Sequence, residues 1–297
     1  MKGSDQNEAG SNIDSPFIIE KEIKNFTSTS ELNLIPQGNK SHIFDVPLVR
    51  FADGDDPIFT KYKSIIGPTH FTPREALAKA HGLNPEDMLD KLSVISWILP
   101  ITEKTRQSER NETSFPSRFW AYTRWYGEKF NDALREHMVE FLTRKGHLAT
   151  SPAIQPYFKR ESNEKGQFSN WSERHIAFAA GQGTFSLSDG FITERGIAHR
   201  CGSVVTNLKL PTSQRTANGT HSNCLFFANA SCKACISRCP AGAISEKGHD
   251  KNKCEDYVYT KLSYLSSEYN VGLAGCGLCQ VKVPCESKNP TSKLRNN

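Results

Sequence analysis

The feature that most constrains this chain is a dense run of cysteines toward its C-terminal end. Eight of the nine cysteines of the 297-residue sequence lie within the 62 residues from Cys224 to Cys285. Their spacing reads Cys224-x7-Cys232-x2-Cys235-x3-Cys239-Pro240, then Cys254, then Cys276-x2-Cys279-x5-Cys285. Disulfides, structural zinc sites and iron-sulfur clusters are the three frameworks that such a segment suggests.

The spacing favours iron-sulfur clusters. Disulfides are typical of small secreted domains, whereas this sequence is long and shows no signal peptide. Structural zinc usually shows two separated Cys-x2-Cys knuckles or mixtures of cysteine and histidine. Cys-x2-Cys-x3-Cys-Pro instead matches the bacterial two-cluster ferredoxin pattern, in which the last cysteine binds the other cluster. We therefore expect two 4Fe-4S clusters.

The same ferredoxin pattern, in which the last cysteine of each motif binds the cluster of the other motif, predicts which cysteines share a cluster. Asn229 stands where the usual first cysteine falls, so Cys224 is assigned its role. A three-iron species or a non-cysteine ligand at either cluster is the alternative. Cys201 lies outside both motifs and is expected to be a small buried residue. The predicted ligands are Cys224, Cys232, Cys235 and Cys285 for cluster 1, and Cys239, Cys254, Cys276 and Cys279 for cluster 2.

Composition and local patterns divide the remaining chain. A polar, disordered tail is expected over residues 1–16, an α/β domain over 17–211, a linker over 212–223, a double-cluster module over 224–290 and a tail over 291–297. Within the first domain, apolar periodicity and capping signals predict helices over 17–26, 72–82, 117–145 and at the start of 171–183. Apolar runs predict a buried strand over 92–99, a strand pair over 185–193 and a strand over 202–211.

The charge and hydropathy of the chain limit its partners. The formal net charge is +5 with no long basic run, which gives little reason to expect nucleic acid as an obligate partner, although a tRNA-sized substrate is compatible with it. No segment approaches the roughly 18 to 20 consecutive apolar residues of a membrane span. A cytoplasmic protein without a membrane partner is expected.

Two sequence blocks resemble a known family. The cysteine motifs CKACISRCPAGAI and GCGLCQ, separated by an isolated cysteine, are similar to the iron-sulfur part of epoxyqueuosine reductases and corrinoid reductive dehalogenases. The segment SERHIAFAAGQGTFSLSDGFIT, followed by GSVVTNLKLP, extends this resemblance over about residues 90–287. It implies an α+β protein: a nitroreductase-like α/β domain that binds cobalamin, followed by a ferredoxin-like double-cluster module that passes electrons to the cobalt.

The resemblance also bears on the site residues. Enzymes that act on epoxyqueuosine have an acidic proton donor where Trp125 stands here, which argues against that substrate. Dehalogenases use a tyrosine with a basic neighbour, a role that Tyr126 with Arg124 or Lys129 resembles. A reduction also needs a titratable proton donor in the pocket. Tyr126 and Asp189 are the catalytic candidates, with His175 as a further titratable residue, and a structural role is the alternative for each. The Gly-x-Gly turn of Gly181 and Gly183 is a weak candidate for cofactor binding.

Two functions follow from these observations. The first is an oxidoreductase that takes electrons from a ferredoxin or flavodoxin class donor and reduces a small-molecule or nucleoside-like substrate. The second is a non-catalytic, ferredoxin-type electron-transfer protein whose large first domain docks a partner enzyme. A wide pocket that faces one cluster favours the first function, and a filled core favours the second.

Overall fold

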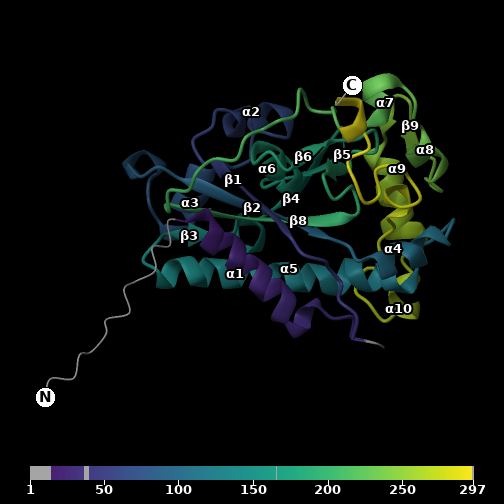
Figure 1. The fold of residues 1–297 in the computed structure, drawn as a ribbon, viewed down its shortest axis with the longest axis horizontal. Coiled ribbons are helices and arrows are strands. Elements are labelled where there is room, and N and C mark those ends of the chain that lie inside the picture. The colour runs from purple at the N-terminus through teal and green to yellow at the C-terminus, as the bar shows by residue number, and fades with distance from the viewer. Residues whose placement is uncertain (1–14, 37–39, 165, 296–297) are drawn as a thin grey trace, which may run out of the picture.

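A four-stranded antiparallel sheet lies at the centre of the computed structural model, which describes residues 15–36, 40–164 and 166–295. The strand order is β1-β2-β8-β3. Helices cover both faces of the sheet, and the cysteine-rich segment lies at one of its ends (Figure 1). The strands are β1 (Leu48–Asp53), β2 (Ser93–Pro100), β8 (His199–Thr206) and β3 (Ala149–Thr150).

Strand β2 organises the packing. Every one of its residues is buried, which confirms the buried strand predicted over 92–99. Ile95 and Trp97 pack with helices α1 (Pro16–Thr29) and α5 (Arg118–Arg144), and Val94 packs with the helices of the opposite face. Because strand residues alternate between faces, the sheet is the middle of three layers. The opposite face is covered by α2 (Ile58–Ile65), α3 (Pro73–His81) and α6 (Glu173–Ala179).

Local sequence signals fix the ends of the predicted helices. The Thr72 hydroxyl accepts a hydrogen bond from the backbone N–H of Glu75, whose carboxylate accepts in return from the backbone N–H of Thr72. The Ser117 hydroxyl caps α5 by accepting from the N–H of Trp120 at 3.2 Å. Both helices and the mixed α/β architecture are confirmed. Within the described residues, no helix has the length and apolar character needed to cross a membrane.

The predicted end of one strand and the predicted end of the N-terminal tail differ from the structure. The strand predicted over 202–211 is β8, which ends at Thr206 because that residue already pairs with Ser93, the first residue of β2. Of the predicted tail over 1–16, residues 1–14 lie outside the described residues, and α1 begins at Pro16. Shorter elements are α4 (Glu103–Arg110), β4 (Arg160–Asn163), β5 (Gly166–Ser169), and the predicted strand pair, β6 (Gly183–Phe185) with β7 (Phe191–Thr193).

The layer of α2, α3 and α6 buries His70, whose protonation the fold disfavours. Its ring stacks on Trp171, and its Nε2 accepts from the backbone N–H of Ser172 at 3.1 Å. Burial lowers the pKa of His70 from 6.5 to about 4. The unfolded chain therefore binds one more proton between these two pH values, so the stabilising contribution is complete above pH 6.5 and is lost as the pH falls toward 4.

We predict that His70→Gln flattens the pH dependence of stability. The contribution of His70 should fall by about 1.4 kcal/mol per pH unit below 6.5. Anaerobic urea midpoints at pH 7.5 and pH 5.5 measure this slope, with His147→Asn as the control in the loop after α5. Equal slopes for the wild type and the His70 variant would contradict the prediction.

Candidate functional site

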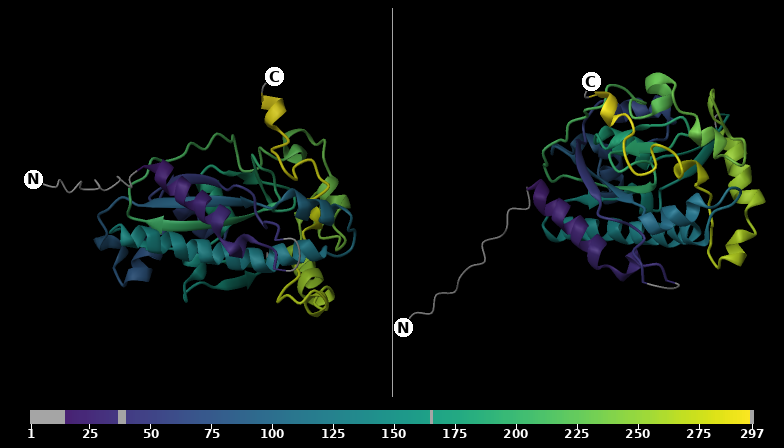
Figure 2. Two further views of the ribbon diagram at one scale, coloured as in Figure 1. Left: turned by 60° about the horizontal axis from the view of Figure 1, so that its bottom comes forward. Right: turned by 45° about the vertical axis from the view of Figure 1, so that its right-hand side comes forward.

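The cysteine-rich segment is built from short helices and turns that pack on the end of the sheet near α4 and the start of α5 (Figures 1 and 2). Its Leu262 and Leu265 belong to the same buried cluster as α5. The segment is therefore packed into the main core. Its elements are α7 (Leu225–Asn229), α8 (Ala234–Ser237), β9 (Ile244–Ser245), β10 (Gly248–His249), α9 (Lys251–Glu255), the π-helix η4 (Asp256–Lys261) and α10 (Leu265–Glu268).

The structure brings together a first cysteine group, made of Cys224, Cys232, Cys235 and Cys285. All four line one small, mostly apolar cavity of about 20 Å³. Burial raises the pKa of Cys235 to about 11, and the neighbouring Cys224 and Cys232 add to this shift. Burial, followed by the same neighbours, also raises the pKa of Cys285. These four thiols share one cavity even though Cys285 lies 50 residues after Cys235 in the sequence.

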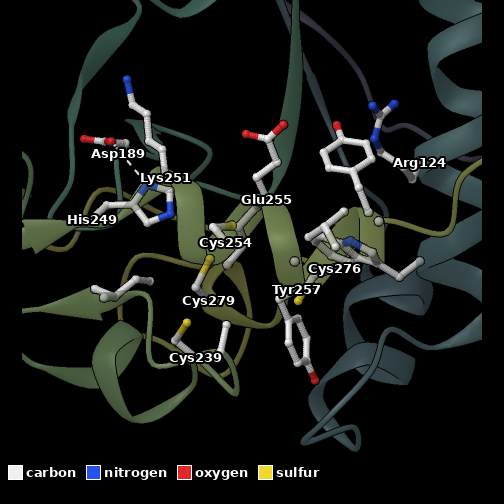
Figure 3. A pocket seen from close by; sticks show the side chains of 18 of the residues that line it. Arg124, Asp189, Cys239, His249, Lys251, Cys254, Glu255, Tyr257, Cys276 and Cys279 are labelled. Carbon is white, nitrogen blue, oxygen red and sulfur yellow. Dashed lines mark hydrogen bonds and ion pairs between the residues drawn. The ribbon is translucent and has the colours of Figure 1, made fainter. Parts of the chain in front are cut away.

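A second cysteine group contains Cys239, Cys254, Cys276 and Cys279. Figure 3 shows their sulfur atoms along one wall of a larger cavity, which all four residues line. Burial raises the pKa of Cys279, and the other three members of the group add to the shift. The backbone N–H of Ala243 donates to the Cys239 sulfur at 3.3 Å. Such N–H groups stabilise a metal-bound thiolate and tune its reduction potential.

The chemistry of these donors fits iron-sulfur clusters. Burial raises the pKa of two thiols in each group, Cys235 and Cys285 in the first and Cys276 and Cys279 in the second. Such thiols stay protonated unless a metal supplies compensating charge. Among the described residues, no group of three or more Cys, His, Asp and Glu side chains is arranged for a single metal ion. A 4Fe-4S cluster has a different requirement, because each of its cysteines binds a different iron.

Two contacts tie these cysteines to the first part of the chain. The Arg238 guanidinium donates to the carbonyl oxygens of Leu278 and Val281 and, at 2.8 Å, to that of Glu112. Gly277, which has a φ of 118°, lies so close to Trp120 that an added Cβ would stand 2.1 Å from the indole nitrogen. Only glycine fits this position next to Cys276.

The cavity beside the second cysteine group has a volume of about 350 Å³. A neighbouring cavity of about 300 Å³ shares four lining residues with it. Each volume lies in the range of small-molecule sites, about 300 to 1,000 Å³. The shared residues are Arg174, His199, Arg200 and Gln280.

Asp189 lines the larger cavity and pairs with a histidine of the cysteine-rich segment. Its Oδ2 lies 3.2 Å from Nδ1 of His249, a contact drawn in Figure 3. Burial alone would raise the pKa of Asp189, but the His249 contact and the charges of Arg174 and Lys251 together outweigh burial and lower it. For His249, burial works against protonation, while Asp189 and Cys254 raise its pKa to about 9. The pair therefore places one proton between two side chains at the cavity edge.

The other sequence candidates lie elsewhere. Tyr126 packs edge-on against Tyr122 and is not among the residues that line either cavity. Gly181 and Gly183 allow close backbone approaches to Gln214 and Ile192 instead of lining the cavities.

Three further residues named from the sequence, Trp125, His175 and Cys201, lie in packing contacts outside the two cysteine groups. Trp125 covers Gly272, and its ring lies 4.9 Å from the Lys129 ammonium. His175 is buried beside Tyr62. Cys201 lies on β8, outside both cysteine groups, and lines only the second cavity.

The sequence analysis missed most of the charged residues of the cavities. His249 stands five residues before the isolated Cys254, and that proximity was the available signal. Arg200 lies in the otherwise mostly apolar strand HRCGSVVT, where a charge is unusual unless it is paired. Arg174 and Lys251 gave no signal, because cations on helices are commonly solvated.

No family model matches the chain. Over 119 residues, the chain is 30% identical to an epoxyqueuosine reductase of Bacillus anthracis, a match that covers 38% of this chain and 29% of that protein. A solved epoxyqueuosine reductase of Bacillus subtilis is 15% identical, with 92% of this chain and 66% of that one covered at a TM-score of 0.46.

A reductive dehalogenase shares the fold. It is the catabolic reductive dehalogenase NpRdhA, solved in complex with 3-bromo-4-hydroxybenzoic acid. The match covers 94% of this chain and 37% of NpRdhA, with a TM-score of 0.52 and 13% sequence identity. The chain therefore corresponds to little more than a third of that protein, and its match to the curated relative spans less than a third of that relative's length. The match to the Bacillus anthracis protein supports the predicted resemblance to epoxyqueuosine reductases, and the likeness to NpRdhA shows a shared fold.

Proposed function

We propose that this chain is an iron-sulfur oxidoreductase in which two 4Fe-4S clusters pass electrons to an acceptor bound in the cavity beside the second cysteine group. The observation that carries the proposal is the sorting of eight cysteines into two groups of four, one of which lines that cavity. The partial identity to an epoxyqueuosine reductase supports a reductive function.

The order of the groups gives the electrons a direction. Exposed residues of α7, including Phe227, lie beside the first cysteine group, so we assign the entry of electrons from a ferredoxin or flavodoxin class donor to that side. The second group faces the cavity, so we assign it the exit. The domain division at residues 212–223 is part of the same proposal: a nitroreductase-like α/β part supplies the pocket, and a ferredoxin-like module supplies the clusters.

Cobalamin is the acceptor that the family resemblance implies. A cobalamin would lie in the larger cavity beside the second cysteine group, and the space shared with the second cavity would be left for a substrate. When bound, it would supply a metal that accepts electrons and reacts with the substrate. Ala241, Tyr257 and Val258, which line that cavity from the cysteine-rich segment, would contact it.

The chain's own residues supply the proton. The reduction of a small molecule consumes protons as well as electrons, and a positioned side chain can deliver them. The proton between His249 Nδ1 and Asp189 Oδ2 lies on the lining of the cavity, and the raised pKa of His249 keeps it bound at neutral pH. We assign this pair the role sought in Tyr126. The filled surroundings of Tyr126 give it no contact with the cavities.

The competing function is a non-catalytic electron carrier. It requires a first domain that serves only for docking, with no internal space beside a cluster. Two adjoining cavities at the second cysteine group favour the oxidoreductase, because they offer room for an acceptor where the electrons would leave.

The first test is cluster content. Anaerobic reconstitution should give about eight irons and eight acid-labile sulfides per chain. Cys224→Ala should lose one cluster because it removes a ligand of the first group, and Cys201→Ala should lose none. Tightly bound zinc without labile sulfide, or loss of iron in the Cys201 variant alone, would overturn the assignment.

The second test is the acceptor. We expect titration of the reconstituted protein with cob(II)alamin to change the electron paramagnetic resonance spectrum of the cobalt at one equivalent. Ala241→Trp should abolish the change because Ala241 lines the cavity, whereas Ala228→Trp on the exposed α7 should not. Retained cluster absorbance shows that each variant is folded. An unchanged cobalt spectrum in the wild type would refute cobalamin as the acceptor.

A further inference from the structure

The wall shared by the two cavities carries an incompletely paired arginine. Arg200 extends from β8 and lines both cavities. Its ion pair is with Glu128, at 3.6 Å between Nη1 and Oε2. Its Nε is buried without a hydrogen-bond partner among the described residues. The Arg200 side chain is 25% exposed and forms only this one ion pair in the part of the chain that the structure describes, so its guanidinium fork has donors to spare.

A second arginine of the same network shows the contrast. The Nη atoms of Arg135 contact the carboxylates of Glu128 at 3.1 Å, Asp132 at 2.6 Å and Glu173 at 3.2 Å, as well as the Cys201 carbonyl oxygen at 3.1 Å. Arg135 thus takes up most of the negative charge nearby. Arg200 and Arg124 are left to share the remaining oxygen of Glu128, at 3.6 and 3.9 Å.

The electrostatic strain at Arg200 follows from this arrangement. Burial, followed by the charge of Arg124, lowers its pKa to about 10. Desolvated like charges that face a cavity are costly unless an anion balances them. The three arginines of the network equal its three carboxylates in number, but Arg135 contacts all three carboxylates at 3.2 Å or less, which leaves Arg200 with a single contact at 3.6 Å.

Further cations surround the same space. Arg174 donates to the backbone carbonyl oxygen of Asp189, and neither it nor Lys251 forms an ion pair with a carboxylate in the described part of the chain. Figure 3 shows the Arg124 and Lys251 side chains extending away from the sulfur atoms of the second cysteine group. The larger cavity is lined by four Lys and Arg residues but by only two carboxylates, Asp189 and Glu255.

We propose that the space shared by the two cavities binds the oxyanion end of a small molecule, a carboxylate or a phosphate, with Arg200 as its main receptor and Arg124 and Arg174 beside it. Two or more guanidinium groups suit such an anion because their donors are arranged as a planar fork. This inference rests on the proposed function, because it names the chemical class of the substrate that would be reduced beside the bound acceptor.

Equilibrium binding to the oxidised, cluster-reconstituted protein tests this inference without electron transfer. Isothermal titration calorimetry at low salt uses inorganic phosphate in one arm and benzoate in the other, which separates the two sources of an oxyanion. We expect one of them to bind, and Arg200→Gln to weaken that binding about tenfold or more, as loss of a charge-assisted hydrogen bond predicts. Arg195→Gln, an exposed arginine paired with Asp45, is the matched control and should change binding less than twofold.

Three outcomes would overturn the inference. They are no binding of either anion by protein with intact clusters, equal weakening by both variants, and a shift of cluster potential in Arg200→Gln without any change in anion binding. The last result would show that the arginine serves the cluster charge. If Arg200→Gln fails to fold, Arg174→Gln tests the same wall, with the same tenfold expectation. Failure of electron transfer with intact anion binding would count against the proposed function alone.

Discussion

The buried carboxylate of Glu286 holds the C-terminal end of the chain against its first half. Its Oε1 lies 3.3 Å from Nε of Arg106, its Oε2 accepts from Nε of Arg110 at 3.0 Å, and it also accepts from the backbone N–H of Lys282. The neighbouring Cys285 carbonyl oxygen accepts from the N–H of Ile197 at 2.8 Å. Removing one member of such a buried pair typically costs about 3 to 5 kcal/mol. Because Cys285 completes the first cysteine group, the ion pair fixes the position of the last of the proposed cluster ligands.

The site depends on that closure. In the predicted ferredoxin-type pattern, a cysteine from the C-terminal end of the segment joins Cys224 in one cluster. The same part of the chain places residues 276–280 beside Trp120 and Arg124 at the start of α5. The cavity beside the second cysteine group is therefore bounded by both halves of the chain. If the proposed clusters bind here, their binding and the folding of this part are coupled, because the thiols become stable ligands only with the metal present.

Much of the architecture was readable from local signals. The Thr72 capping box, the apolar run of β2 and the periodicity of α5 each depend on neighbouring residues, and the structure contains all three. The end of β8 was misplaced because a strand stops where its partner stops, and the start of β2 at Ser93 is not visible from the sequence of β8.

The candidate site was only partly predictable. The cysteine spacing predicted the same two groups of four that the structure brings together, because ferredoxin-type spacing carries its own geometry. The Asp189–His249 pair and the arginines of the shared wall were not predicted, since they meet through tertiary packing of segments about 60 to 75 residues apart.

The central claim is that the two cysteine groups hold adjacent clusters that form one electron path. Electron paramagnetic resonance of the fully reduced, reconstituted protein tests it most directly, because two neighbouring reduced clusters split each other's signals. The account predicts a spin-coupled spectrum in the wild type that becomes the simple spectrum of a single cluster in Cys285→Ala. Two independent, uncoupled signals in the wild type, or a spectrum that Cys285→Ala leaves unchanged, would contradict it.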